Sequence, residues 1–389
     1  MKSRSLLLLV LALALLLPAG CKSEQAILQE RYGPSLLEMS RAGLDGAGLT
    51  EIWSQDLAQG PKGKREKVTV TRVYLYPLPL QTGQADNAAS VARPQGAVLV
   101  TTATNALYCF DWNTGQIQWV TVTPEPLKVA PVLVDNAYYA VIGRQLLTVS
   151  AKGEITVGGH LPTSVVRPLL VLGEYIFAVG SDGAVYKVDK TNLAQVWASP
   201  ARTDSVIMNA PELLAGMLVF GTVGGELIGV DRVIGGRRLD VRGFGAIPGV
   251  ATDGRMVYFG SADYHEYCYS SFGSEVWNTV VEGQVARAPV LANDVVYQDV
   301  MGRGLVALDI KSGAILWKNP EAEGFLSTDG ECVIATGVLG QLLVIDAADG
   351  ATKSRFDATQ YCIAPVNPVG DGAVVLASRD GRVVCLKAK

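Results

Sequence analysis

Short runs of alternating apolar and polar residues recur along the chain from about residue 50 to the C-terminus. The clearest example spans residues 304–317, where an alternating strand ends at Asp309, a turn carries Gly313 and a second strand reaches Trp317. Alternation with a period of two places one set of side chains on a buried face, so this frame predicts two antiparallel strands joined by a tight turn. Similar runs between the copies, such as residues 295–299, predict four short strands in each repeat.

The frame occurs eight times along the chain. Its strand-end positions lie 37 to 42 residues apart, at residues 111, 150, 189, 231, 270, 309, 346 and 387. A regular period of this length indicates a repeat fold in which each copy forms one supersecondary unit. Four antiparallel strands per copy are typical of a propeller blade. We therefore expect an all-β, eight-bladed β-propeller over residues 49–389.

The residues that recur in the frame have mechanical roles. A carboxylate at a strand end can accept hydrogen bonds from the backbone of the turn while glycine takes the positive φ. We expect this structural role for Asp111, Asp189, Asp231, Asp309 and Asp346. A large flat ring near the outermost strand can cover the seam between two blades. We expect this packing role, rather than ligand stacking, for Trp53, Trp119, Trp197, Trp277 and Trp317.

The eighth copy reaches the C-terminus at Lys389 without an outer strand. Because a closed ring leaves no strand edge unpaired, we expect residues 51–55, which carry Trp53, to supply the missing strand. Residues 67–76 would then form the innermost strand of the first blade; the alternative is that they close the ring themselves. The polar stretch 81–94 is expected to be a surface insertion in the first blade.

The N-terminus has the pattern of an export leader. Lys2 and Arg4 precede an apolar run of 12 residues, 6–17, which is too short for the roughly 20 residues that span a bilayer. The Ala-Gly-Cys sequence that ends at Cys21 resembles a bacterial lipobox, although Pro18 departs from it. The resemblance implies cleavage after residue 20 and acylation of Cys21 with chains such as palmitate. The alternative is an ordinary secretory signal with a chance cysteine.

Residues 21–48 are expected to be a tether with one or two helical turns. Lys22 follows the cysteine, and in the sorting rule of such lipoproteins this residue type favours the outer membrane over the inner one. We therefore expect a chain anchored by lipid in the cell envelope, on the periplasmic face of the outer membrane.

Composition excludes several classes of function. The net charge is −4, with acidic and basic residues interspersed, so the chain lacks the basic surface that nucleic acid binding requires. Its two histidines argue against a His-rich metal centre or haem held by paired histidines. We expect no metal and no cofactor.

Two groups of reactive residues have competing interpretations. Asp263, His265 and Glu266 fit either a solvated turn, which we favour because alternating side chains point to opposite faces, or a weak metal site. Cys332 and Cys362 could form a disulfide, but two buried thiols are favoured. The remaining cysteines share one repeat position and are expected to be small packing residues, namely Cys109, Cys268 and Cys385.

The frame Leu-x-Ala-Leu-Asp-x-x-x-Gly-x-x-x-Trp at residues 305–317 resembles the pyrroloquinoline-quinone-type propeller repeat, over about residues 50–389. This motif specifies fold more strongly than function. One branch of the superfamily, the quinoprotein dehydrogenases, implies a stacked quinone, calcium, a catalytic Asp and commonly a disulfide between adjacent cysteines. The chain has no Cys-Cys pair, and its blades leave little room for the insertions that build a quinone site.

The other branch, the BamB family of outer-membrane assembly lipoproteins, is the better match in leader type, length, tether and uninterrupted blades. It implies a non-catalytic, monomeric scaffold whose partners are the β-barrel assembly protein and unfolded outer-membrane clients. That family binds its partner through an Arg-Gly element after the third blade. Residues 203–211 have only Arg202 nearby and no glycine after it, so no partner-binding residue is assigned and a different envelope partner is an alternative.

Two further functions are weighed against the scaffold. A quinone- or calcium-dependent oxidoreductase would follow from the dehydrogenase branch. A module that binds a polysaccharide or another envelope polymer would present aromatic side chains on one propeller face, for which the candidates are Tyr138, Tyr139 and Tyr264.

Overall fold

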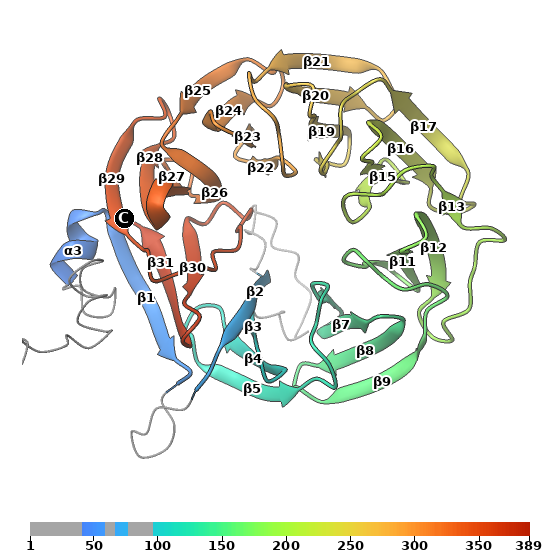
Figure 1. Ribbon diagram of the computed structural model, residues 1–389, viewed down its shortest axis with the longest axis horizontal. Coiled ribbons are helices and arrows are strands. Elements are labelled where there is room, and N and C mark those ends of the chain that lie inside the picture. Colours follow the sequence, from blue (N-terminus) through green and yellow to red (C-terminus); the bar gives the residue numbers. More distant parts are fainter. Residues whose placement is uncertain (1–40, 59–66, 77–95) are drawn as a thin grey trace, which may run out of the picture. The chain divides into compact units, whose positions relative to one another are not determined.

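The computed structural model describes residues 41–58, 67–76 and 96–389 (Figure 1). The chain divides into two compact units, residues 1–42 and 43–389, and the second contains all of the described strands. The expected leader, the tether up to residue 40 and the insertion at 81–94 lie outside the described residues. Among the residues that are described, no helix is both long enough and apolar enough to span a bilayer.

The strands form eight antiparallel sheets, which confirms the expected eight-bladed propeller. Seven sheets have four strands that follow one another along the chain. Figure 1 shows the sheets around a ring, with the first strand of each blade innermost and the last outermost.

The first four blades are built as follows. Blade one has β2 (Val70–Tyr76), β3 (Ala97–Thr102), β4 (Ala106–Asp111) and β5 (Ile117–Val122); blade two has β6 (Val132–Val134), β7 (Ala137–Ile142), β8 (Gln145–Ser150) and β9 (Ile155–His160); blade three has β10 (Leu170–Leu172), β11 (Tyr175–Val179), β12 (Ala184–Asp189) and β13 (Ala201–Arg202); blade four has β14 (Glu212–Leu214), β15 (Met217–Gly221), β16 (Glu226–Asp231) and β17 (Arg237–Arg242).

The second half continues the pattern. Blade five has β18 (Ala251–Thr252), β19 (Met256–Gly260), β20 (His265–Ser270) and β21 (Glu275–Val280); blade six has β22 (Val290–Ala292), β23 (Val295–Val300), β24 (Gly304–Asp309) and β25 (Ile315–Asn319); blade seven has β26 (Ala322–Thr328), β27 (Cys332–Gly337), β28 (Gln341–Asp346) and β29 (Thr352–Asp357); blade eight has β30 (Ala373–Ala377), β31 (Arg382–Ala388) and β1 (Leu49–Asp56). Two short helices, α3 (Arg41–Gly46) and η2 (Val338–Gly340), complete the described elements.

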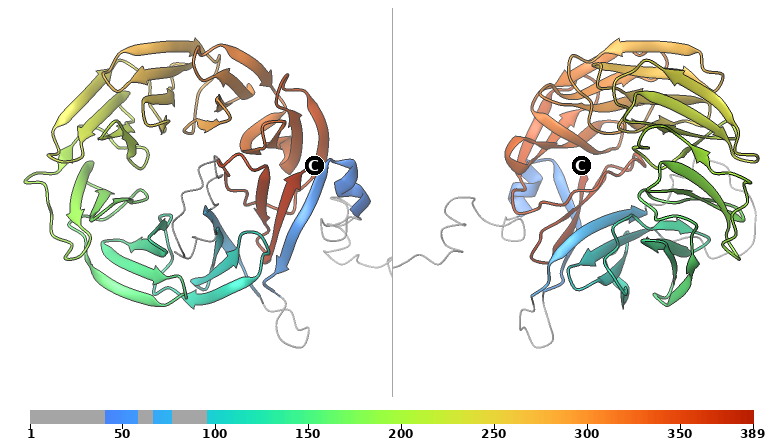
Figure 2. Two further views of the ribbon diagram at one scale, coloured as in Figure 1. Left: turned by 180° about the vertical axis from the view of Figure 1, so that it is seen from behind. Right: turned by 45° about the vertical axis from the view of Figure 1, so that its right-hand side comes forward.

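The N-terminal strand closes the ring, as expected. β1 pairs antiparallel with β31 over its whole length, and Trp53 stands opposite Cys385. All views place β1 beside β31 at the outer edge (Figure 2). The backbone N–H of Lys389 also donates a hydrogen bond to the carbonyl oxygen of Gly48, at 3.0 Å. The alternative closure is wrong, because β2 pairs with β3 inside blade one. An isolated bridge between Ile363 and Ala377 supplies the inner edge of blade eight.

The recurrent Asp residues sit in the turns between the third and fourth strands. Asp309 Oδ1 accepts hydrogen bonds from the backbone N–H of Lys311 at 3.2 Å and of Ser312 at 2.8 Å. Gly313 then takes a φ of 70°, which is the left-handed region that favours glycine. Side-chain oxygens accept equivalent backbone bonds in the same turn of other blades, at Asp111, Asp189, Asp231 and Asp346.

Each recurrent tryptophan covers the turn glycine of the next blade. A Cβ added to Gly313 of blade six would lie 2.5 Å from Cδ2 of Trp277 in blade five. The indole Nε1 of Trp277 donates a hydrogen bond to the carbonyl oxygen of Ile310, at 3.1 Å. The other tryptophan–glycine contacts are Trp53 with Gly115, Trp119 with Gly153, Trp197 with Gly235, and Trp317 with Gly350. The rings therefore join neighbouring blades.

The seam between blades two and three reverses this arrangement. Blade two has Val157 where five of the other blades have tryptophan, and blade three has Leu193 where others have glycine. Leu193 adopts a φ of 59°, which is strained for a leucine. A Cβ on Gly159 would lie 3.1 Å from Cδ1 of Leu193, so the leucine side chain packs toward the outer strand that lacks a tryptophan.

The cysteines follow the expectation with one exception. The three that share a repeat position, Cys109, Cys268 and Cys385, are buried, and burial raises the pKa of Cys385 to about 12. Cys332 is buried and Cys362 is exposed, and both are free thiols. The expectation of two buried thiols is therefore wrong for Cys362, which lies in the connection that leads into blade eight.

Candidate partner-binding face

The loops of the propeller divide between two faces. In blade four the first residue of β16, Glu226, pairs with the last residue of β17, Arg242. The hairpin between the second and third strands therefore lies at the same edge as the connection to the next blade. We call this edge of the blades the connection face; its described hairpins are 103–105, 143–144, 180–183, 222–225, 261–264, 301–303, 338–340 and 378–381. The Asp turns lie on the opposite, turn face.

The connection face carries exposed apolar side chains on successive blades. A loop is usually polar, and apolar groups gathered on one face mark sites of interaction more often than singly scattered ones do. The exposed fractions are 38% for Val166, 58% for Val206, 48% for Val223, 48% for Tyr264, 60% for Met301, 51% for Val338 and 37% for Val366. On the turn face the turns of two neighbouring blades carry Val233, Ile234 and Phe272 exposed.

The connection from blade three to blade four holds one of these side chains in a fixed position. The backbone N–H of Met208 donates to the carbonyl oxygen of Gly221, and that of Val223 donates to Val206, at 3.1 and 3.0 Å. Ser205 Oγ accepts a further bond from Gly224 N–H, at 2.8 Å. The connection therefore runs as an added strand beside the hairpin of blade four, and Val206 and Val223 are adjacent.

Arg202, the arginine that directly precedes this connection in the sequence, is engaged within the protein. Its Nη1 lies 3.1 Å from Oδ2 of Asp182 in the hairpin of blade three. The same carboxylate oxygen accepts a hydrogen bond from the hydroxyl of Tyr186, at 2.6 Å. These contacts tie the end of blade three to its own hairpin. Arg202 is exposed but already ion-paired, whereas Val206 and Val223 form an exposed apolar pair.

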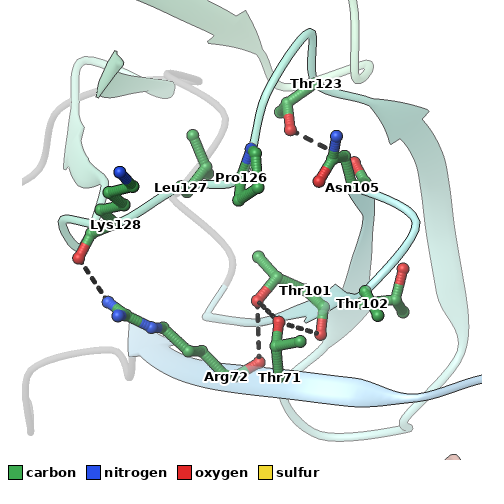
Figure 3. Close-up of a pocket in the computed structure, with 10 residues that line it drawn as sticks. Thr71, Arg72, Thr101, Thr102, Asn105, Thr123, Pro126, Leu127 and Lys128 are labelled. Carbon is green, nitrogen blue, oxygen red and sulfur yellow. Dashed lines mark hydrogen bonds between the residues drawn. The ribbon is translucent and has the colours of Figure 1, made fainter. Parts of the chain in front are cut away.

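A pocket of about 230 Å³ opens on the connection face between blades one and two (Figure 3). Its lining comes from the start of β2, the β3–β4 hairpin and the connection that follows β5: Thr71, Arg72, Thr101, Thr102, Ala103, Asn105, Thr123, Pro126, Leu127 and Lys128. All four threonine hydroxyls of this lining bond inside the protein. Thr71 Oγ1 donates to Thr101 O at 3.1 Å, and Thr123 Oγ1 to Asn105 O at 3.2 Å.

Of the residues considered as a metal or acid–base cluster in blade five, Asp263 and His265 lie together, with His265 Nδ1 3.7 Å from Asp263 Oδ1, and Glu266 is buried apart from them. His265 N–H and the Tyr267 hydroxyl donate to the two carboxylate oxygens of Asp263, at 3.2 and 2.9 Å. Glu266 is fully buried, and burial raises its pKa well above the ordinary range. The solvated-turn expectation is therefore wrong for Glu266. In the described ranges, no three His, Cys, Asp or Glu side chains are grouped so that they could hold a metal ion.

The tyrosines considered for polymer binding do not form an aromatic face. Tyr138 is 5% exposed and packs between blades one and two, with its ring 5.9 Å from that of Trp119. Tyr139 is partly buried in the next seam. Tyr264 alone of the three is exposed, at the apex of the blade-five hairpin. Tyr138 is therefore not available as a surface for the polymer-binding alternative, because its side chain packs inside the seam between two blades.

Sequence reasoning did not identify the apolar side chains of the connection face. Val206 and Ile207 are neighbours of similar chemistry, yet Val206 is 58% exposed and Ile207 is 1% exposed. The difference arises from the bridge between Ile207 and Thr222, which fixes the side that faces inward. The signal in the sequence was the position of Val206 and Val223, because both lie outside the repeating frame whose apolar residues form the core.

Comparisons with known proteins agree with the architecture. The family model described as "Outer membrane protein assembly factor BamB" matches residues 42–153, 138–241 and 233–339. A sequence comparison with curated proteins finds no match.

Three solved structures are similar to the chain. BamB from Moraxella catarrhalis aligns at 17% identity and a TM-score of 0.64, covering 88% of this chain and 98% of that one. The computationally designed Ika8 protein aligns at 15% identity and 0.63, covering 83% and 97%. The C-terminal WD40 domain of Sif2 aligns at 12% identity and 0.63, covering 88% and 98%. At these identities the structures show the propeller fold alone. The family match spans most of the chain, and the protein belongs to the family of the outer membrane protein assembly factor BamB.

Proposed function

We propose that the protein is a lipid-anchored scaffold of the cell envelope that assists the assembly of β-barrels into the outer membrane. The observation that carries the proposal is the family match over residues 42–339. In this proposal no residue is catalytic and no cofactor is required. The propeller works as a monomer whose rigid loops hold a partner in place.

The connection face is the docking surface in this proposal. Its exposed valines can be covered by a partner, and burying one such side chain contributes about 1.5 kcal/mol or more. The connection at residues 203–211 already pairs with the blade-four hairpin as an added strand. A partner's extended segment can use the same combination of backbone hydrogen bonds and apolar pockets. The partner we propose is the β-barrel assembly protein, with unfolded outer-membrane proteins as clients.

The anchor is a lipid on Cys21, exposed as the mature N-terminus when residues 1–20 are removed. A single acyl chain binds membranes weakly and reversibly, whereas more than one gives stable attachment. We propose that the acylated cysteine holds the propeller at the periplasmic face of the outer membrane. Cys21→Ala should move the protein from the membrane fraction to the soluble periplasmic fraction, and retention of that variant in the membrane would contradict the proposed anchor.

Site-specific photocrosslinking in cells tests the docking surface. A photoreactive amino acid is placed at Val206 on the connection face and, as the matched control, at Phe272 on the turn face, which is 91% exposed. We expect a crosslink to the β-barrel assembly protein from position 206 and none from position 272. No crosslink from position 206, or equal crosslinks from both positions, would overturn the assignment of the face.

A further inference from the structure

Two cationic side chains stand together at one side of the pocket between blades one and two (Figure 3). Arg72 and Lys128 are both exposed, and Arg72 Nη1 donates a hydrogen bond to the backbone oxygen of Lys128. This bond fixes the guanidinium group of Arg72 against the backbone of Lys128. Within the part of the chain that is described, neither side chain pairs with a carboxylate, and no acidic residue lines the pocket. The two positive charges at one pocket therefore favour a bound anion.

A neutral donor lies across the pocket from the two cations. Asn105 occupies the apex of the β3–β4 hairpin with a φ of 62°, a left-handed conformation that asparagine tolerates. Its carbonyl oxygen accepts the backbone N–H of Thr123 at 2.9 Å, so the hairpin is fixed to the connection that follows β5. Its side-chain amide has no hydrogen-bond partner among the described residues. Figure 3 shows this side chain opposite Arg72 and Lys128.

The remaining lining determines the rest of the ligand. Leu127 and Pro126 lie between the cations and Asn105 (Figure 3). The Thr71 and Thr101 hydroxyls lie 2.9 Å apart and bond to each other. The volume of about 230 Å³ is below the range of roughly 300–1,000 Å³ that accommodates drug-sized ligands. The free polar groups are therefore two cations and one neutral amide around a small, largely apolar space.

We propose that this pocket binds a small organic anion. Its negatively charged head group lies between Arg72 and Lys128, and a short apolar chain packs against Leu127 and Pro126. Asn105 donates to the ligand from the opposite side. A carboxylate and a phosphate ester both supply the head group, since each accepts charge-assisted hydrogen bonds from guanidinium and ammonium groups. The inference stands on the pocket alone and does not depend on the proposed assembly role.

Titration of the full chain with four short-chain probes tests the charge preference. Butyrate and butyl phosphate carry the anionic head, butyramide is neutral and butylammonium is cationic. We expect an anionic probe to bind with a Kd on the order of 1 mM, as suits a ligand of so few atoms, and the neutral and cationic probes to show no saturable binding. Binding of butyrate alone assigns a carboxylate, and binding of butyl phosphate alone assigns a phosphate ester.

Two variants in the pocket and one control variant show whether the anion binds at this site. The substitutions are mild, so that a loss of binding does not come from misfolding. Lys128→Gln should weaken the anion at least about tenfold, because it removes a charge-assisted hydrogen bond. Asn105→Gly removes the amide, while glycine accepts the positive φ, and should weaken binding several-fold. Lys152→Gln, at an exposed lysine on the turn face, is the matched control and should change nothing. Equal binding of butyramide and butyrate, or unchanged binding in Lys128→Gln and Asn105→Gly, would overturn the proposal.

Discussion

Trp53 lies on the N-terminal strand and packs against blade one, where the ring closes. It is 6% exposed, its ring stacks on Phe110 with centroids 6.1 Å apart, and its Nε1 donates to the carbonyl oxygen of Trp112 at 2.8 Å. Burial of a tryptophan removes about 150–250 Å² from water, which corresponds to about 4–6 kcal/mol at 25 cal/mol per Å². Because the unfolded chain already buries part of that area, we expect Trp53→Ala to lower the free energy of unfolding by about 4 kcal/mol.

Urea unfolding of the full chain, followed by circular dichroism, measures this change. Trp53→Phe keeps an aromatic ring but loses the indole hydrogen bond, and should lower the free energy of unfolding by about 1–2 kcal/mol. Ile52→Ala, at a 45% exposed neighbour on the same strand, should change it by less than about 0.5 kcal/mol. A difference of about 1 kcal/mol is close to the uncertainty of free energies of unfolding extrapolated from urea. If the free energies of unfolding of Trp53→Ala and Ile52→Ala differ by less than this, the argument that Trp53 secures the closure is refuted.

Three further predictions follow from single sites. Burial raises the pKa of Glu266 well above its ordinary value of 4.5, so the folded protein holds this proton to a higher pH than the unfolded chain does. The free energy of unfolding should therefore fall by about 1.4 kcal/mol per pH unit between pH 4.5 and the pKa of Glu266 in the folded protein. Glu266→Gln should abolish that slope in urea titrations at several pH values, and an unchanged slope would count against the buried carboxyl. Gly313→Ala places a methyl against the Trp277 ring at a positive φ and should destabilise by about 2–3 kcal/mol; a neutral effect would refute the close packing of this seam. Of the cysteines after residue 21, Cys362 alone should react rapidly with a thiol reagent in the native protein, and rapid labelling without denaturant would contradict the buried state of Cys109, Cys268, Cys332 and Cys385.

The blade architecture could be predicted because its determinants are local. Strand alternation, the Asp that accepts backbone bonds in the turn and the glycine with positive φ all lie within one repeat of about 40 residues. Closure by the strand that contains Trp53 could also be predicted, since an eighth frame without an outer strand requires one from elsewhere. Leu193 was harder to anticipate, because a leucine at a left-handed position makes sense only beside a neighbouring blade that lacks a tryptophan.

The candidate site depended on contacts between repeats. Arg72, Asn105 and Lys128 come from three separate segments and meet only where two blades join. Glu266 had a readable signal, because the equivalent positions in other repeats are apolar, as at Leu227 and Leu305. Its charge suggested a solvated turn, whereas the repeat position determines that it is buried.

The central claim, that the protein assists β-barrel assembly through its connection face, is tested most directly in cells that lack the protein. The abundance of folded outer-membrane β-barrel proteins is measured after complementation with the unmodified chain, with Val206→Asp/Val223→Asp, or with Phe272→Asp on the opposite face. All three chains are matched for expression. We predict that the unmodified chain and Phe272→Asp restore the β-barrel proteins and that the double variant does not. Full restoration by the double variant would contradict the face, and unchanged β-barrel levels without the protein would contradict the function.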